Sequence, residues 1–299
     1  VDTTIDGATL VRPNDARFRF TGATGFSFGT TYPDTLFLQP SSRYPSARGS
    51  QPVYSVEFTT NAPVFEVFTK YLSTSQTIQV KVDGQRTTAT PRPVGGTKPG
   101  SRLLYKVDLG SAATRRITLE TSYTPFGGVY VPAGSTLTQS PNRPGRWIVL
   151  GDSISGGSGQ NSGAGAGTWV LRAGAYLGWG DTWNQSIGGT GYLDPGASVA
   201  IPARAADDVA SHAPDGVVLW AGYNDHTRSQ SDLQAAVRQT VTAIATDAPD
   251  AQLFVVGPWS PTGAPPDTLV TTDATLRSVA ASEEIPFISP ITGRVYDAA

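Results

Sequence analysis

A hydroxyl side chain directly follows one of the most apolar stretches of the sequence. Residues 147–150 are all apolar, Gly151 interrupts them, and Asp152 and Ser153 come next. This pattern is typical of a buried parallel strand that ends at the carboxyl edge of its sheet, where open α/β sheets bind their ligands. We therefore predict that Ser153 is a nucleophile displayed at that edge.

Two other predicted strands run into polar or glycine-rich loops. The strand predicted at 182–187 leads into a loop that contains Gly189, and the strand predicted at 215–221 is followed by a turn that contains Asn224. Parallel strands bring their carboxyl ends to one edge, so both loops are expected to face Ser153. A hydroxyl with a close glycine N–H and an amide N–H is a set for acyl transfer, because the donors stabilise the negative charge of the tetrahedral intermediate.

Each motif taken alone is more often structural, since a glycine after a strand makes a turn and an Asn–Asp pair caps a helix. Their order along the chain, each at the end of a strand with a helix between, favours catalysis. In this order the motifs resemble the SGNH (GDSL-type) hydrolase family over about residues 145–290. The resemblance rests on three blocks, which are Gly151-Asp152-Ser153, residues 184–189 and Gly222-Tyr223-Asn224-Asp225.

The resemblance implies a fold and a set of roles. Ser153 would be the nucleophile, and the oxyanion hole would consist of the Ser153 N–H, the Gly189 N–H and the Asn224 side chain. The implied fold is a flavodoxin-like α/β/α sandwich. In the related two-domain carbohydrate esterases, an all-β sandwich precedes this catalytic domain. The blocks are specific for the family and carry no information on the substrate.

The sequence departs from the family in its catalytic base. The family's D-x-x-H segment near the C-terminus is missing, and Asp297 is followed only by two alanines. Of the two histidines, His212 follows a predicted helix and His226 follows the Asn–Asp pair; we assign the base to neither. Three explanations stay open: the polypeptide continues past Ala299, a second chain supplies the Asp–His pair, or the fold is kept for binding alone.

The elements that would position these residues alternate between strand and helix. Residues 217–220 and 253–256 are continuous apolar runs, as expected for a parallel sheet covered on both faces. The clearest helix is 231–246, whose apolar residues lie on one face and whose predicted N-cap is Ser231. The remaining predicted elements are helices at 168–177, 201–211 and 267–282 and a last strand at 287–288.

The first half has the period of two that is typical of strands. Apolar and polar residues alternate at 54–58, 78–82, 103–109 and 117–119, which predicts half-buried strands with one face in water. Asp83-Gly84 predicts a tight hairpin turn. We expect an antiparallel sandwich or jelly roll over residues 1–140 and the hydrolase domain over 145–299, with 125–144, rich in Pro and Gly, as the linker.

Several aromatic residues are candidates for substrate contacts. Tyr223 and Trp259 are expected near Ser153, where they would bind an acyl group or a sugar ring, although Trp259 packing its own loop is equally consistent with the sequence. In the first domain, exposed aromatics on strands could stack on sugars, but core or edge packing is the more common role of such residues. These candidates are Tyr32, Phe37, Tyr44 and Tyr71.

Composition excludes several classes of function. The 299-residue chain has a formal net charge of -2 and no block of like charge, so we expect no nucleic-acid partner. It has no cysteine, no apolar run long enough to span a bilayer and no cluster with metal-ligand spacing; we expect neither membrane insertion, nor a metal, nor a cofactor. Low charge with abundant Thr, Ser, Gly and Pro favours a secreted or virion-associated protein.

Together these observations predict an esterase that removes acetyl or another short acyl group from a carbohydrate. The alternative is a non-catalytic adhesin or virion tail component that binds a glycan on a degenerate hydrolase fold.

Overall fold

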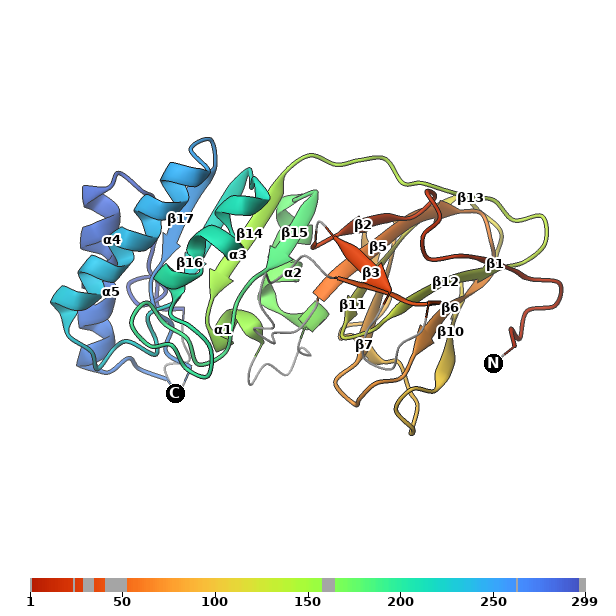
Figure 1. The fold of residues 1–299 in the computed structure, drawn as a ribbon, viewed down its shortest axis with the longest axis horizontal. Coiled ribbons are helices and arrows are strands. Elements are labelled where there is room, and N and C mark those ends of the chain that lie inside the picture. Colours follow the sequence, from red (N-terminus) through yellow and green to blue (C-terminus); the bar gives the residue numbers. More distant parts are fainter. Residues whose placement is uncertain are drawn as a thin grey trace. The chain divides into compact units, whose positions relative to one another are not determined.

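The computed structural model describes residues 2–23, 25–28, 35–40, 53–157, 165–261 and 263–295. They fall into two compact units that divide between Arg143 and Pro144, inside the predicted linker (Figure 1). The short 3₁₀ helix η1 (Gly165–Gly167) belongs to the first unit although it follows the first strand of the second.

The first unit is an antiparallel β-sandwich, as the alternating pattern predicted. In the described residues one sheet has the strand order β10-β6-β12-β4-β3 with β1 on β12, and the other β13-β5-β11-β7-β8 with β2 on β5 and β9 on β7. The two sheets enclose an apolar core in which Phe58 of one meets Phe65 of the other edge-to-face, with ring centroids 5.6 Å apart. The strands are β1 (Thr9–Val11), β2 (Arg19–Thr21), β3 (Phe26–Phe28), β4 (Leu38–Pro40), β5 (Val53–Thr60), β6 (Val64–Lys70), β7 (Thr77–Val82), β8 (Gln85–Arg86), β9 (Arg92–Pro93), β10 (Arg102–Asp108), β11 (Arg115–Ser122), β12 (Phe126–Val131) and β13 (Leu137–Thr138).

The prediction of a linker over 125–144 is wrong, because this stretch contributes β12 and β13 to the sandwich. Its glycines serve close packing. At Gly128, where φ is 102° and the register of the β12–β6 pair shifts, a Cβ would lie 2.1 Å from the carbonyl oxygen of Val11. At Gly127 a Cβ would meet the rings of Phe37 and Phe68. The glycines at 127 and 128 are therefore needed because the strand is closely packed, and they do not indicate a flexible linker.

The hairpin prediction at Asp83-Gly84 is confirmed. Both residues have positive φ, 52° and 88°, as a type I′ turn requires, and they join β7 to β8. The predicted wet face of β5, β7 and β11 is wrong: Glu57, Lys81 and Glu120 are all buried. Arg19 donates to Glu57 at 2.7 Å and Lys81 pairs with Glu120, so these charges neutralise one another out of water.

The aromatic candidates of the first unit serve its core where the structure describes them. Phe37 is 1% exposed and Tyr71 is 8% exposed, so both side chains pack inside the unit. Tyr32 and Tyr44 lie outside the described residues.

In the part of the chain that the structure describes, the second unit is a five-stranded parallel sheet with helices, which confirms the predicted fold class. Its strand order β15-β14-β16-β17-β18 puts the second strand before the first, as in flavodoxin-like sheets. Loops after β14, β15 and β16 therefore meet at the carboxyl edge. The strands are β14 (Arg146–Gly151), β15 (Asp181–Asn184), β16 (Gly216–Trp220), β17 (Gln252–Val256) and β18 (Phe287–Ile288).

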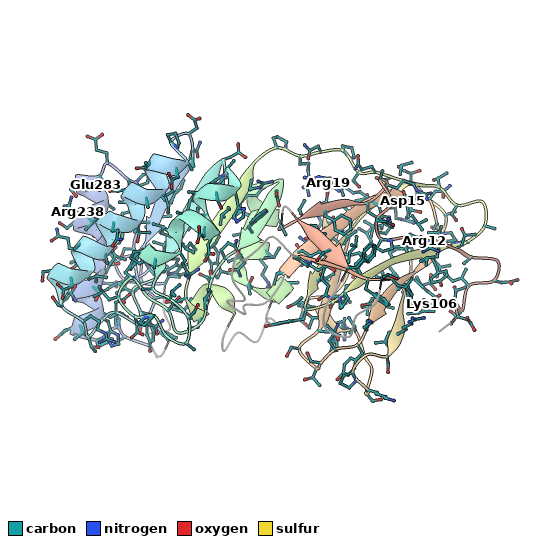
Figure 2. The ribbon with its side chains drawn as sticks, in the orientation of Figure 1. Arg12, Asp15, Arg19, Lys106, Arg238 and Glu283 are labelled. Carbon is teal, nitrogen blue, oxygen red and sulfur yellow. The ribbon has the colours of Figure 1, made fainter. Side chains whose placement is uncertain are left out.

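Helices α3 (Ala205–Asp208), α4 (Gln230–Asp247) and α5 (Asp267–Ser282) pack on one face of this sheet (Figure 1). Arg238 of α4 donates to Glu283, just past α5, at 2.5 Å (Figure 2). The N-cap of α4 is Ser229, whose hydroxyl accepts from the Asp232 N–H, so the prediction of Ser231 is wrong. No described helix is long and apolar enough to cross a membrane.

The predicted helix 201–211 is also wrong as a continuous element. It is divided into η2 (Ile201–Ala203), α3 and η3 (Ala210–His212), with non-helical backbone at Arg204 and Val209. The side chain of Arg204 is fully buried there, among acceptors contributed by distant loops.

The other face of the sheet carries α2 (Trp169–Leu177), and the expectation of full cover holds only in part among the described residues. Beside α2 is an apolar hollow of about 550 Å³, lined by side chains of the second unit such as Trp147, Trp220, Phe254 and Ile288. Trp147 stacks on Trp179 in its wall, with centroids 4.7 Å apart.

Candidate active site

Ser153 is presented where β14 gives way to helix α1 (Ser153–Gly156). The buried Asp152 caps this helix, because its Oδ1 accepts the Ile154 N–H at 2.8 Å. As the first helical residue, Ser153 has an N–H with no partner within the helix. Its side chain is half-buried. The apolar strand, the cap and the single turn of helix thus leave both a hydroxyl and an N–H of one residue at the carboxyl edge.

The glycine loop lies against this serine. The Thr190 N–H bonds the Ile187 carbonyl at 3.3 Å, and Gly189, the third residue of that turn, has a φ of 77°. A positive φ at this position alone is the mark of a type II turn, which needs glycine there. A Cβ built on Gly188 would lie 3.5 Å from Cβ of Ser153. The loop after β15 and the helix after β14 are therefore in contact.

Asn224 joins the same cluster from the loop after β16. Its Nδ2 donates to the Thr190 carbonyl at 2.8 Å, and the side chain is half-buried. An amide nitrogen carries two hydrogens, so this bond orients the group and leaves the second hydrogen for another acceptor. The structure thus brings together the Ser153, Gly189 and Asn224 segments that the sequence placed at three strand ends.

Asp225 organises the adjoining loop instead of capping the helix that follows it. Its carboxylate accepts the N–H groups of Tyr192, Leu193 and Asp194 at 2.9, 2.9 and 3.1 Å. A Cβ on Gly191 would be 2.3 Å from this carboxylate, so glycine is required for the loop to wrap around it. Asp225 is completely buried. It ties the glycine loop to the Asn224 turn.

The structure also reveals a residue that sequence reasoning missed. Arg204 is completely buried and pairs with Asp208 at 2.9 Å. In a helix, Arg204 would lie on the apolar side, because it follows Ile201 by three residues and is next to Ala205. Asp208, four residues later, would lie on the same side. An arginine on an apolar helix face with an aspartate four residues later is the sequence pattern that could have predicted this buried pair, since a buried charge needs partners.

Burial raises the pKa of the Asp152 carboxyl from its ordinary value of 3.8 to about 7. Repulsion from Asp225 acts in the same direction, whereas the hydrogen bond from Ile154 and the attraction of Arg204 oppose it. The carboxyl beside Ser153 therefore binds a proton more tightly in the folded than in the unfolded chain.

This shift predicts a stability that depends on pH. The folded state binds more protons than the unfolded state between about pH 4 and pH 7, so the free energy of unfolding should fall as pH rises through that window. Asp152→Asn keeps an acceptor for Ile154 and removes the charge; we expect its stability, relative to wild type, to improve by a few kcal/mol from pH 4 to pH 7.5, at about 1.4 kcal/mol per pK unit. Urea unfolding at several pH values measures this, with the exposed Asp250→Asn as control. Parallel curves for wild type and Asp152→Asn would contradict it.

The two histidines lie in different places. The His212 carbonyl accepts from Arg146 at the start of β14, and its ring lies 4.7 Å from Trp183, so it belongs to the amino end of the sheet. Burial and the nearby Arg146 lower its pKa. His226 is in the turn of Asn224, with Nδ1 2.6 Å from the Tyr223 carbonyl. Because a carbonyl only accepts, Nδ1 is the donor in this hydrogen bond.

The two predicted substrate contacts have structural neighbours. The Tyr223 ring is half-buried and lies 5.6 Å from the His226 ring. Trp259 donates its indole N–H to the Val295 carbonyl at 2.5 Å, which lies outside its own loop. Their contact with a substrate stays a prediction. The described residues contain no group of three His, Cys, Asp or Glu side chains arranged to hold a metal ion.

The chain is similar to a known protein family and to several solved structures. Residues 149–298 match the model of the GDSL-like lipase/acylhydrolase family. No curated protein matches the sequence. A salicylyl-acyltransferase from a tetracycline biosynthetic pathway has a similar structure, with 18% identity and a TM-score of 0.70 over 95% of this chain and 85% of that one.

Two carbohydrate esterases have similar structures as well. One is a family two carbohydrate esterase from Clostridium thermocellum, solved with cellohexaose, which is 16% identical with a TM-score of 0.65 over 91% of this chain and 88% of that one. The other is an acetyl xylan esterase from Butyrivibrio proteoclasticus, 13% identical with a TM-score of 0.65 over 94% and 89%. Each alignment covers more than nine-tenths of this chain, so the shared fold includes the sandwich and the parallel sheet.

Proposed function

This chain belongs to the GDSL-like lipase/acylhydrolase family, and from that premise we propose that it is a serine esterase with Ser153 as its nucleophile. The observation that carries the proposal is the convergence of three loops: Gly188 packs on Ser153, and Asn224 is bonded to Thr190 of the same glycine loop. A hydroxyl, a helix-start N–H, a turn glycine and an oriented amide are what acyl transfer requires at one place.

In the proposed mechanism the Ser153 Oγ attacks the ester carbonyl carbon and gives its proton to a base. The carbonyl oxygen becomes an oxyanion, which accepts hydrogen bonds from the Ser153 N–H, the Gly189 N–H and Asn224 Nδ2. Collapse of this intermediate breaks the ester bond, the alcohol takes the proton, and the acyl group stays on Ser153. Water then attacks the acyl-enzyme and releases the acid.

We propose an acylated carbohydrate as the substrate. The support is the likeness over both units to structures described as carbohydrate esterases, one of them an acetyl xylan esterase. The test is to incubate the protein, with imidazole added as a general base, with acetylated xylan and with p-nitrophenyl acetate, and to measure released acetate and p-nitrophenol. Turnover of both supports the proposal. Turnover of p-nitrophenyl acetate alone would leave an esterase of another ester class. Binding of xylan without any turnover would favour the glycan-binding alternative.

We further propose that the base is an imidazole that these 299 residues do not carry, because the resemblance assigns it to a D-x-x-H segment and not to the turn of His226. Added imidazole is then expected to raise the Ser153-dependent hydrolysis of p-nitrophenyl acetate in the 299-residue protein. His226→Ala should change the rate less than tenfold and respond to imidazole equally. The reaction of imidazole itself is subtracted with Ser153→Ala. Loss of all turnover in His226→Ala, with no response of wild type to imidazole, would instead identify His226 as the base.

A further inference from the structure

The guanidinium of Arg204 binds three loop segments of the site at once. Nη2 donates to the Gly151 carbonyl at 3.0 Å and to Thr190 Oγ1 at 3.3 Å, and Nη1 donates to the Gln185 carbonyl at 2.7 Å. Gly151 ends β14, Gln185 follows β15, and Thr190 closes the glycine turn. A single planar, rigid group thus fixes the distance between the segment that carries Ser153 and the turn that carries Gly189.

Thr190 extends this connection to the third loop. Its hydroxyl accepts from Arg204 and donates to the Ile187 carbonyl at 2.8 Å, which closes the turn around Gly189. Its backbone carbonyl accepts from Asn224 at 2.8 Å. Every segment proposed to line the oxyanion hole is therefore one hydrogen bond from Arg204 or from Thr190.

Burial of the Arg204 cation is unfavourable for the stability of the fold. Desolvation of a guanidinium costs several kcal/mol, and replacement of buried ion pairs by apolar groups is often neutral or stabilising. Arg204 is 0% exposed, and the Asp208 side chain that neutralises it is also 0% exposed. The gain in stability therefore does not explain this buried pair. The need to hold several backbone N–H donors in fixed positions does explain it.

We infer that Arg204 is the positioning residue of the oxyanion hole, acting through the Gly151 carbonyl and through Thr190 on Gly189 and Asn224. The inference rests on the proposed esterase function. It assigns Arg204 no contact with the substrate. The oxyanion is absent from the bound substrate and forms only on the way to and in the tetrahedral intermediate, so loosening its donors should lower kcat and leave KM nearly unchanged.

The first test is Arg204→Lys, which keeps the charge but cannot reach three acceptors in a plane. With p-nitrophenyl acetate we expect kcat to fall about 10- to 100-fold and KM to change less than threefold. Arg277→Lys is the control, since Arg277 also pairs with an aspartate four residues away, Asp273, but is 48% exposed and outside the site. Its kcat should equal that of wild type. All assays contain imidazole as the base, are corrected for its own reaction with Ser153→Ala, and are made at a temperature at which circular dichroism shows each variant folded.

A second pair of variants decides the question if Arg204→Lys does not fold. Thr190→Val removes the hydroxyl without changing the side-chain shape and leaves the Arg204–Asp208 pair intact, so kcat should fall about tenfold or more. Thr190→Ser restores the hydroxyl and should recover most of the rate.

Combination with Asn224→Ala separates positioning from a general loss of structure. If Arg204 and Thr190 act through the oxyanion donors, the second substitution should cost several-fold less once Asn224 is absent, because only the Ser153 and Gly189 donors are then left to be positioned. Full additivity in the double variants would overturn the inference, as would a kcat within threefold of wild type in both Arg204→Lys and Thr190→Val. A wild-type protein that stays inactive even with imidazole added as the base would overturn the proposed function itself.

Discussion

With imidazole added as the base, replacing Ser153 by alanine is expected to lower the hydrolysis of p-nitrophenyl acetate to the rate of imidazole alone, because the proposed nucleophile of the acyl-enzyme route is removed. The fold should be unaffected. Ser153 is half-buried at the start of α1, where alanine is well tolerated and the N–H of residue 153 is kept. The loss should appear in kcat, with thermal unfolding within a few degrees of wild type.

Ser155→Ala is a demanding control for this experiment. Ser155 is buried in the same short helix, and its Oγ accepts the indole N–H of Trp169 at 3.1 Å. Its removal should cost about 1 kcal/mol of stability and leave kcat within a few-fold of wild type. If Ser153→Ala retains wild-type turnover, Ser153 is not the nucleophile, even though the fold is that of a hydrolase family.

Replacing Asn224 by alanine should lower kcat by about 10²- to 10³-fold with little change in KM, since the amide hydrogen that remains free is proposed to stabilise the oxyanion. The substitution also removes the bond to the Thr190 carbonyl. Asn224→Asp tests the donor specifically, because a carboxylate of the same shape offers no hydrogen and repels the developing charge. It should be at least as impaired as the alanine variant.

A matched control for these variants is Asn61→Ala. Asn61 accepts the Thr136 N–H at 2.7 Å within the sandwich, so this change also removes one asparagine hydrogen bond but outside the site. Equal kcat values for wild type and Asn224→Ala would exclude Asn224 from the oxyanion hole. The proposed nucleophile would then depend on the donors of Ser153 and Gly189 alone.

The parts of this protein that the sequence predicted correctly are those with a local signal. Helix α5 begins and ends at the predicted residues, and β14, β16 and β17 follow from apolar runs closed by a glycine. The Asp83-Gly84 hairpin follows from residues that tolerate positive φ. In each case the information lies within a few residues, because backbone conformation and burial of one face are set by neighbours in the chain.

The errors arose where partners distant in sequence decided the outcome. Residues 126–131 have the composition of a linker, yet Val11, Phe37 and Phe68 pack on their glycines. The polar side chains of β5, β7 and β11 alternate as a wet face would, yet they are buried as ion pairs whose members lie on different strands. Composition records neither contact, since both depend on strand pairing across tens of residues.

The candidate site divides in the same way. The sequence by itself determined which groups stand at the carboxyl ends of the strands, namely Ser153, Gly189 and Asn224, because parallel topology follows from the alternation of elements. Only the tertiary structure decided how they are held: the type II turn against Ser153, the wrapping of a loop around Asp225, and the buried Arg204 between three segments. The hydrogen bonds that hold these loops use mainly backbone carbonyls and N–H groups. Nearly every residue has these groups, so the pattern of side chains in the sequence does not predict which of them are bonded.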